Sequence, residues 1–128
     1  MTIHQPAKLL KIYIGESYYF NGFPIYETIL GEAKQQNISG VTVIRGDEGM
    51  GHVGVVQNRD NERNHDLPIM IEIIDTAEKI EKFIPAAAKV MGNHGLIAVS
   101  DVTIVHRGIT VPVSSAKDPL GNDIKGRD

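Results

Sequence analysis

The chain has 128 residues, of which 41% are hydrophobic and 23% are charged, and its formal net charge is −3. That length suits one domain with a hydrophobic core, and the composition is that of an ordinary globular protein. A mildly acidic chain does not offer the basic surface expected of a nucleic-acid-binding protein. No apolar run approaches the roughly 20 residues needed to cross a bilayer, so we expect no membrane insertion.

The chain has no cysteine, and residues 1–8 lack the apolar stretch of a signal peptide. Neither a disulfide framework nor secretion is supported, and we expect a cytoplasmic protein. We interpret residues 1–8 as a flexible N-terminus, residues 9–107 as the folded domain and residues 108–128 as a loose tail. The tail combines prolines and glycines with scattered charges, which leaves it little to pack.

The first half of the domain has the pattern of a strand, a helix and a second strand. Residues 9–14 are a short run of β-forming residues, and residues 41–44 are β-branched throughout and end before Gly46. A loop over residues 16–23 leads to Pro24, which suits the first turn of a helix. Apolar residues then recur at helical spacing, which predicts one apolar stripe facing a sheet.

The second half repeats the same order. Residues 69–74 form a strand pattern led by Pro68, a residue found at the first position or the edge of a strand. Asp75 and Glu78 resemble an N-terminal capping pair for the strongest helical pattern of the chain. Pro85 interrupts this pattern and is expected to kink or break the helix.

Residues 96–105 are expected to form the last strand. The alternation of apolar and polar residues changes phase around Ser100-Asp101. Such a change predicts a bulge or a bend at this point of the strand.

The order strand, helix, strand, repeated with right-handed crossovers, predicts an α+β fold of the ferredoxin-like type, the split βαβ sandwich (βαββαβ). Its four-stranded antiparallel sheet would carry both helices on one face. The expected strands carry apolar residues on both faces of the sheet: Val41 and Val43 would lie on one face and Ile44 on the other. An apolar second face favours a closed homo-oligomer, and a monomer with uneven strands is the alternative.

A polar, glycine-rich connection over residues 46–66 separates the two halves. A connection this long in a compact domain is usually a binding or signalling element, or else disordered. Gly49-Met50-Gly51 lies near its start, directly after a strand. Glycines in this position let backbone N–H groups turn toward a phosphate, although a flexible loop root would have the same sequence.

Two further elements favour anion binding. A second glycine turn, Gly92-Asn93-His94-Gly95, holds the corresponding place in the second half, and His106-Arg107 follows the last strand. We expect these elements and the Gly49-Met50-Gly51 segment to meet at one edge of the sheet. Arg107 or Arg45 would then supply the charged hydrogen bonds to a phosphate.

Catalytic and metal-binding signals are weak. The histidines His52, His65, His94 and His106 show no spacing that would place two metal ligands on one helix face. The sequence has no G-x-S-x-G nucleophile motif, no cysteine and no pair of acids at strand ends. We therefore assign no catalytic residue and no metal ligand.

Several motifs together resemble a family of small prokaryotic PII-like proteins, and more distantly the PII nitrogen-signalling proteins. The resemblance extends over residues 9–107. It is carried by residues 11–16, residues 22–27, residues 40–46, Gly49-Met50-Gly51-His52 and residues 66–75.

The resemblance implies a homotrimer whose three intersubunit clefts bind ATP, ADP or AMP as effectors, with no resident cofactor and no enzymatic activity. It implies that residues 46–66 are the T-loop, which changes shape with the nucleotide and docks on a protein target. We expect that target to be a membrane transporter or an enzyme.

Carried over residue by residue, the resemblance places Thr42 near the adenine and Gly49 and Gly51 at the root of the T-loop. It assigns phosphate contacts to the turn Gly92-Asn93-His94-Gly95 and basic contacts to His106 and Arg107. The turn lacks the lysine that follows its glycines in PII proteins, and the last strand ends in one arginine where PII proteins have two. Fewer fixed positive charges should disfavour triphosphates relative to mono- and diphosphates.

The sequence thus predicts a PII-like adenine-nucleotide sensor that is not an enzyme. One alternative is a small enzyme on the same fold, because a fold does not determine a function. Another is a metal-binding trimer that uses His52, His65 and loop carboxylates.

Overall fold

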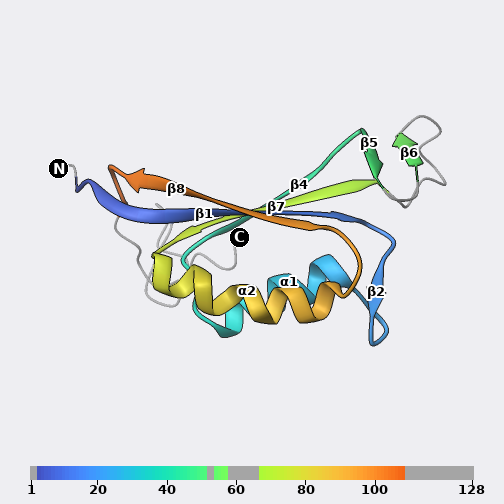
Figure 1. The fold of residues 1–128 in the computed structure, drawn as a ribbon, viewed down its shortest axis with the longest axis horizontal. Helices are drawn as coiled ribbons and strands as arrows, with labels where there is room; N and C mark the ends of the chain where they lie inside the picture. The colour runs from blue at the N-terminus through green and yellow to red at the C-terminus, as the bar shows by residue number, and fades with distance from the viewer. Residues whose placement is uncertain (1–2, 52–53, 58–66, 109–128) are drawn as a thin grey trace, which may run out of the picture.

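The computed structural model describes residues 3–51, 54–57 and 67–108. Four long strands form one antiparallel sheet in the order β4-β7-β1-β8, and α1 and α2 cover the same face of it (Figure 1). The elements of this sandwich are β1 (Gln5–Gly15), α1 (Ile25–Gln35), β4 (Val41–Arg45), β7 (Pro68–Asp75), α2 (Ala77–Met91) and β8 (Leu96–Ile104). The predicted α+β ferredoxin-like fold is confirmed.

The hydrophobic core lies between the sheet and the two helices. Every second side chain is buried on β7 and over residues 10–14 of β1, since successive residues of a strand point to opposite faces. The helices bury residues at helical spacing against this face. The central residues are Leu10, Ile12, Ile14, Ile25, Ile29, Ala33, Ile69, Ile71, Ile73, Ile80, Phe83, Ala87 and Met91.

Two short hairpins complete the described chain. β2 (Tyr19–Phe20) and β3 (Phe23–Pro24) lie in the segment expected to be a loop. Asn21 and Gly22 join them with φ of 50° and 87°, which is the positive-φ pair that a two-residue hairpin turn requires. The second hairpin, β5 (Glu48–Gly51) with β6 (Gly54–Gln57), lies within the connection over residues 46–66.

The boundaries of two strands differ from the predictions. β1 begins at Gln5, because residues 5–8 pair with residues 101–104 of β8, so the expectation that residues 5–8 are flexible is wrong. The same register runs without interruption through Ser100, and the predicted bulge is therefore absent. β8 is a mostly exposed edge strand whose partly buried residues, Ile97, Val102 and Ile104, change phase without a bulge.

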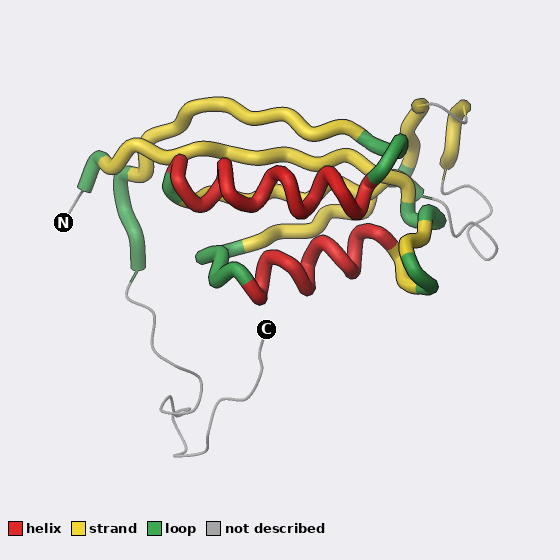
Figure 2. The backbone as a smooth tube through the Cα atoms, turned by 60° about the horizontal axis from the view of Figure 1, so that its bottom comes forward, coloured by secondary structure: helices red, strands yellow, loops and turns green. Residues whose placement is uncertain are grey.

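The predicted cap of α2 is also corrected. The N-cap is Thr76, whose hydroxyl oxygen accepts a hydrogen bond from the Lys79 N–H at 3.2 Å. Asp75 is buried and instead accepts hydrogen bonds from the backbone N–H groups of Ser39 at 2.9 Å and Thr76 at 2.7 Å. The helix is not broken at Pro85 and continues to its last residue (Figure 2).

The two ends of the sheet are referred to below as the loop end and the terminal end. The loop end is where Gly15 lies opposite Pro68 and where β4 finishes and β8 begins. The terminal end is where Gln5 lies opposite Ile104 and where β7 finishes.

None of the helices within the described ranges is long and apolar enough to span a bilayer.

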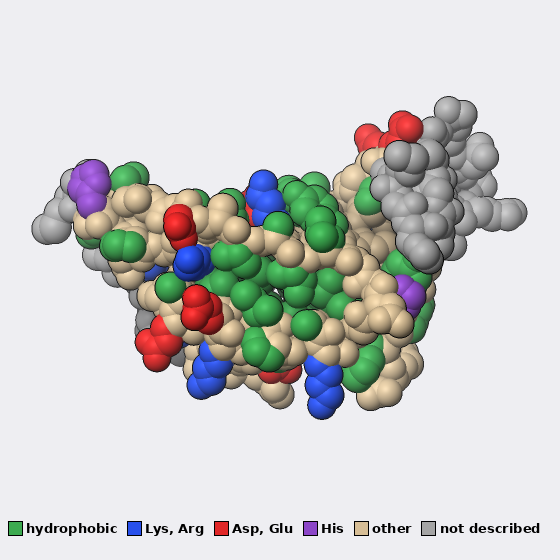
Figure 3. Space-filling view, in the orientation of Figure 1, with side chains coloured by type: hydrophobic (Ala, Val, Ile, Leu, Met, Phe, Trp, Pro, Cys, Tyr) green, Lys and Arg blue, Asp and Glu red, His purple; other side chains and the backbone are tan. Residues whose placement is uncertain are grey.

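The face of the sheet away from the helices, here the open face, carries exposed apolar side chains. Tyr13, Ile44, Ile74 and Leu96 lie on it at register positions that alternate with the buried residues, and each is more than 40% exposed. Seen from the side, further apolar side chains gather where β8 lies above α2 (Figure 3). An apolar face of this kind marks an association surface.

Candidate functional site

The predicted site residues are divided between the two ends of the sheet. Arg45 and the turn over residues 92–95 lie at the loop end, whereas His106 and Arg107 follow β8 at the terminal end. The nine residues of β8 span roughly 30 Å at about 3.3 Å per residue. The expectation that these elements meet at one edge within a single chain is therefore wrong.

Thr42 lies on the open face, directly opposite Glu72 of β7. Glu72 is opposite Lys11 of β1, and their charged groups are 3.9 Å apart. These three residues form a polar row across an otherwise apolar face. The row places the Thr42 hydroxyl near the middle of the sheet, away from both ends.

At the loop end, Glu16 ties together the two ends of the connection over residues 46–66. Its Oε2 accepts a hydrogen bond from Nη2 of Arg45 at 2.7 Å, and its Oε1 lies 3.4 Å from the Leu67 N–H nitrogen. The Glu16 backbone N–H also donates to the Leu67 carbonyl at 2.9 Å. The Gly46 N–H adds a bond to the Pro68 carbonyl at 2.8 Å.

Glu16 was not among the residues singled out from the sequence. The only local feature that could have indicated a role for Glu16 is its position directly after Gly15, where β1 ends, and an acidic residue at such a position is usually solvated. Its side chain is only 20% exposed, whereas that of Arg45 is 48% exposed. The hydrogen bond and the negative charge of Glu16 raise the pKa of Arg45 further above its ordinary value, so the guanidinium is always charged.

Tyr26 completes the surroundings of this ion pair. Burial raises the pKa of its hydroxyl, the carboxylate of Glu27 adds to the increase, and the positive charge of Arg45 opposes it. The Tyr26 hydroxyl donates a hydrogen bond to Glu27 at 3.3 Å. Tyr26 is therefore a neutral hydroxyl next to a charged pair.

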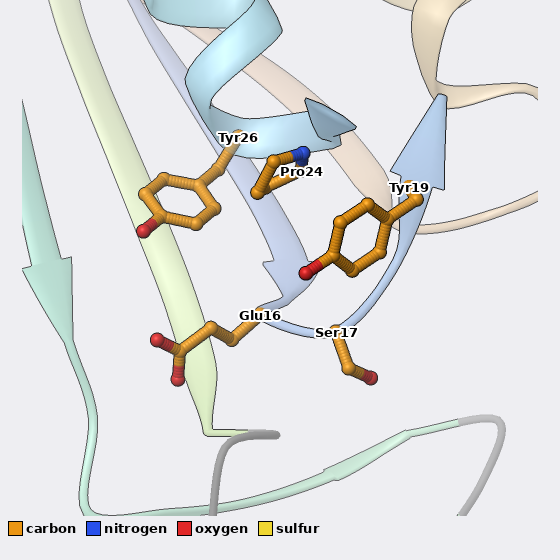
Figure 4. A pocket seen from close by; sticks show the side chains of 5 residues that line it. All are labelled: Glu16, Ser17, Tyr19, Pro24 and Tyr26. Atoms are coloured by element: carbon orange, nitrogen blue, oxygen red, sulfur yellow. The ribbon is translucent and has the colours of Figure 1, made fainter. Parts of the chain in front are cut away.

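A pocket of about 320 Å³ adjoins Glu16. It is lined by Glu16, Ser17, Tyr19, Pro24 and Tyr26. The two tyrosine rings stand on either side of Pro24, and the Tyr19 hydroxyl points toward the side of the pocket that Glu16 borders (Figure 4). The pocket was not predicted, because the β2–β3 hairpin that carries Tyr19 and Pro24 was expected to be a loop.

The glycine turn over residues 92–95 has a fixed shape. Gly95 has a φ of 79°, and a Cβ at this position would lie 2.5 Å from the Tyr13 carbonyl oxygen. The N–H groups of Gly92 and His94 bond to the carbonyls of Ala88 and Met91 at 3.0 Å each. Within the described ranges, the turn's other two N–H groups make no backbone hydrogen bond and could face an anion.

His94 is oriented by an aromatic contact. Its ring stacks on that of Tyr18 with centroids 4.0 Å apart and an interplanar angle of 18°. Tyr18 lies between β1 and β2, so this contact joins the turn to the segment that borders the pocket. The stack fixes the position of the imidazole within the turn over residues 92–95.

Gly49-Met50-Gly51 forms the strand β5 and is paired with β6 in register Gly49 to Val56 and Gly51 to Gly54. Its backbone is thus part of a ladder, whereas a phosphate nest was predicted. Among the residues that the structure describes, no three His, Cys, Asp or Glu side chains form a group suited to a metal ion. His52 and His65, the histidines of the alternative metal site, lie outside the described residues.

Comparison with known proteins gives a family and a fold. The family model described as Uncharacterized ACR, COG1993 (DUF190) matches residues 7–104. A UPF0166 protein of Methanocaldococcus jannaschii is 38% identical over 104 residues, which cover 81% of this chain and 95% of that protein.

Two solved structures are similar at low sequence identity. CPII of Thiomonas intermedia K12, a nitrogen regulatory PII-like protein bound to ADP, AMP and bicarbonate, has a TM-score of 0.65 and 18% identity over 81% of this chain and 92% of that one. GlnK of B. subtilis, in complex with ATP, has a TM-score of 0.51 and 13% identity over 78% of this chain and 84% of that one. At such identities the likeness shows the fold. The chain belongs to the DUF190 family, and its fold is that of the PII-like proteins.

Proposed function

We propose that this protein is a PII-like signal transduction protein that binds adenine nucleotides in the clefts between the subunits of a homotrimer. The observation that carries the proposal is the separation of Arg45 and Arg107 at opposite ends of one sheet. A nucleotide phosphate chain is far too short to contact both residues of one chain. The loop end of one subunit and the terminal end of the next would supply them together.

The open face supports the association of chains. Exposed apolar side chains flank the polar row of Thr42, Glu72 and Lys11, and a second copy would cover them. A closed assembly leaves no such face exposed. Thr42, on this face, is then close to a subunit boundary, where the resemblance places the adenine.

The ligand class is supported by the similar proteins and by the charges of the loop end. CPII is bound to ADP, AMP and bicarbonate, and GlnK to ATP. In this chain Arg45 is already paired with Glu16, and the turn over residues 92–95 offers His94 in place of a lysine. We therefore propose ADP or AMP as a better ligand than ATP, since each charge-assisted phosphate bond contributes roughly 1.5–3 kcal/mol.

The connection over residues 46–66 would be the output element, acting on a transporter or an enzyme. It begins directly after Arg45, so a ligand at Arg45 touches the residue that leads into β5. The assembly would act by binding and would have no catalytic residue of its own.

Mixing two defective variants tests the proposal. Arg45→Gln and Arg107→Gln trimers should each bind ADP weakly in calorimetry, because every cleft lacks one arginine. After the two are unfolded together and reassembled, about a quarter of the clefts should contain both arginines and bind with wild-type affinity, as random assembly of a cyclic trimer requires.

A double variant, Arg45→Gln with Arg107→Gln, reassembled with Arg45→Gln is the matched control and should restore no site. Light scattering on the unmixed proteins should give the mass of three chains. A monomer, or a failure of the mixture to regain binding while the wild type binds ADP, would contradict an intersubunit site.

A further inference from the structure

The ion pair between Glu16 and Arg45 at the loop end suggests how a ligand at Arg45 would affect the connection over residues 46–66. Glu16 Oε2 lies 2.7 Å from Arg45 Nη2, so a carboxylate already accepts a hydrogen bond from this nitrogen. Carboxylate and phosphate oxygens compete for the same N–H donors, because a guanidinium presents them in a fixed planar fork. A phosphate that takes this hydrogen bond must replace Glu16.

The pocket next to Glu16 provides a second position for its side chain. The cavity of about 320 Å³ has room for a carboxylate, and Glu16 itself forms part of its wall. Tyr19 belongs to the same wall, and its hydroxyl points toward the Glu16 side and can donate to a carboxylate, whereas the Tyr26 hydroxyl already donates to Glu27 (Figure 4). A displaced Glu16 could therefore stay hydrogen-bonded after leaving Arg45.

Displacement would also loosen one end of the connection. In the described state the Glu16 carboxylate contacts Arg45 before the connection and Leu67 after it. The backbone bond from Glu16 to Leu67 does not involve the carboxylate and would remain. Displacement would therefore release the Arg45 side chain and the Leu67 N–H, while the backbone bond would keep Leu67 next to Glu16.

We propose that Glu16 is a resident competitor for the oxyanion site at Arg45, which holds Arg45 until a phosphate displaces the carboxylate toward the Tyr19–Tyr26 pocket. The ligand class is a phosphate or pyrophosphate group. The inference deepens the proposed function and rests on it for the identity of the nucleotide. Glu16 is a positioning residue, because it acts on the ligand through Arg45.

The test uses Glu16→Gln in the full chain. The amide oxygen of glutamine can still accept from Leu67, but the negative charge that competes with phosphate is gone. Titration with inorganic pyrophosphate, followed by the NMR signal of the Arg45 Nε–H group, should show about fivefold tighter binding in the variant, the scale of one partly exposed ion pair. ADP should show the same gain in calorimetry, and adenosine should show none.

Asp101→Asn is the matched control. It removes an ion pair of the same 2.7 Å length, between Lys8 and Asp101, at the other end of the sheet, and pyrophosphate binding should not change. The double variant Glu16→Gln with Arg45→Gln should lose the gain. A variant that merely disturbed folding would bind more weakly, whereas competition predicts tighter binding.

The outcomes separate the two proposals. Equal pyrophosphate affinity in wild type and Glu16→Gln, or an Arg45 signal that responds in neither, would overturn the role of Glu16 even if ADP binds. A wild type that binds no adenine nucleotide would remove the proposed function, while the Arg45 signal under pyrophosphate would still decide whether Glu16 competes with an oxyanion.

Discussion

The two ends of the sheet carry ion pairs of equal length in different surroundings. At the terminal end, Lys8 and Asp101 are 2.7 Å apart, and the Asp101 side chain is 85% exposed. At the loop end, Glu16 and Arg45 are also 2.7 Å apart, but Glu16 is mostly covered and contacts Leu67 as well. Distance alone therefore does not distinguish a solvated surface pair from one that links distant segments.

The buried acid of the terminal end has a structural role. Asp75 accepts hydrogen bonds from Ser39 and Thr76, and so joins the chain before β4 to the start of α2. Glu16 instead lies beside a pocket and is paired with the partly exposed Arg45. We therefore expect the terminal acid to contribute to stability, whereas in our proposal the loop-end acid takes part in the response to a ligand.

The largest expected effect is on the glycine turn of the loop end. Gly95→Ala should lower the free energy of unfolding by about 3 kcal/mol, because the new Cβ would overlap the Tyr13 carbonyl and φ is 79°. Gly92→Ala, where φ is 60° but no atom lies within 4 Å of the new Cβ, should cost only about 1 kcal/mol. Urea unfolding measures both, and equal losses would contradict a steric role for Gly95.

The terminal end should respond to the loss of its buried acid. Asp75→Asn should lower the free energy of unfolding by about 2 kcal/mol, because the buried side chain loses its charge and one of the two backbone N–H groups loses its acceptor. Thermal melts of folded protein at neutral pH measure the difference. A loss no larger than that of an exposed carboxylate would show that Ser39 and Thr76 find other partners.

Asp75 also sets a dependence on pH. Burial alone would raise its pKa, but the hydrogen bonds from Ser39 and Thr76 outweigh burial and lower it below the ordinary value of 3.8. A depressed folded-state pKa stabilises the protein above the unfolded value, and this contribution is lost as the pH falls through the folded value. Stability of the wild type should therefore fall more steeply below pH 3.8 than that of Asp75→Asn.

The affinity for ADP should depend on residues at both ends of the sheet. Arg107→Gln should weaken ADP binding by about 1.5–3 kcal/mol, the range for a charge-assisted bond, and leave adenosine unchanged. Calorimetry on folded trimers measures both ligands. Unchanged ADP affinity would remove the terminal end from the site and leave Arg107 as a solvated charge.

A smaller effect is expected at the polar row between the ends. Thr42→Val keeps the β-branched shape and removes the hydroxyl, and it should weaken ADP and adenosine alike by about 1 kcal/mol. A loss confined to ADP would place Thr42 near the phosphates and away from the base. The titrations are those used for Arg107→Gln.

The smallest effect should be that of the exposed ion pair. Asp101→Asn should leave the urea midpoint unchanged within error, because an exposed pair gains little over its hydrated ions. The contrast between the buried and the exposed acid of the terminal end would fail if this variant destabilised the protein as much as Asp75→Asn.

The sequence by itself determined the elements and the faces of this fold. Alternation on β7 and over residues 10–14 of β1, together with helical spacing on α2, identifies buried residues, because side chains return to the same face every 2 residues in a strand and every 3.6 residues in a helix. The same reasoning identifies few residues on β8, a mostly exposed edge strand, and it missed residues 5–8, which belong to β1 through pairing with β8. Asn21-Gly22 was a readable turn signal, but the strands it joins have two residues each.

The tertiary structure decided which residues meet. Strand order and antiparallel pairing place Arg107 at the end of the sheet opposite Arg45, and local patterns contain no information on that distance. The contact between Glu16 and Leu67 joins residues 51 positions apart in the sequence. Periodicity is a property of neighbouring residues, whereas a site is made by long-range pairing, and so the acid that holds Arg45 became visible only in the folded chain.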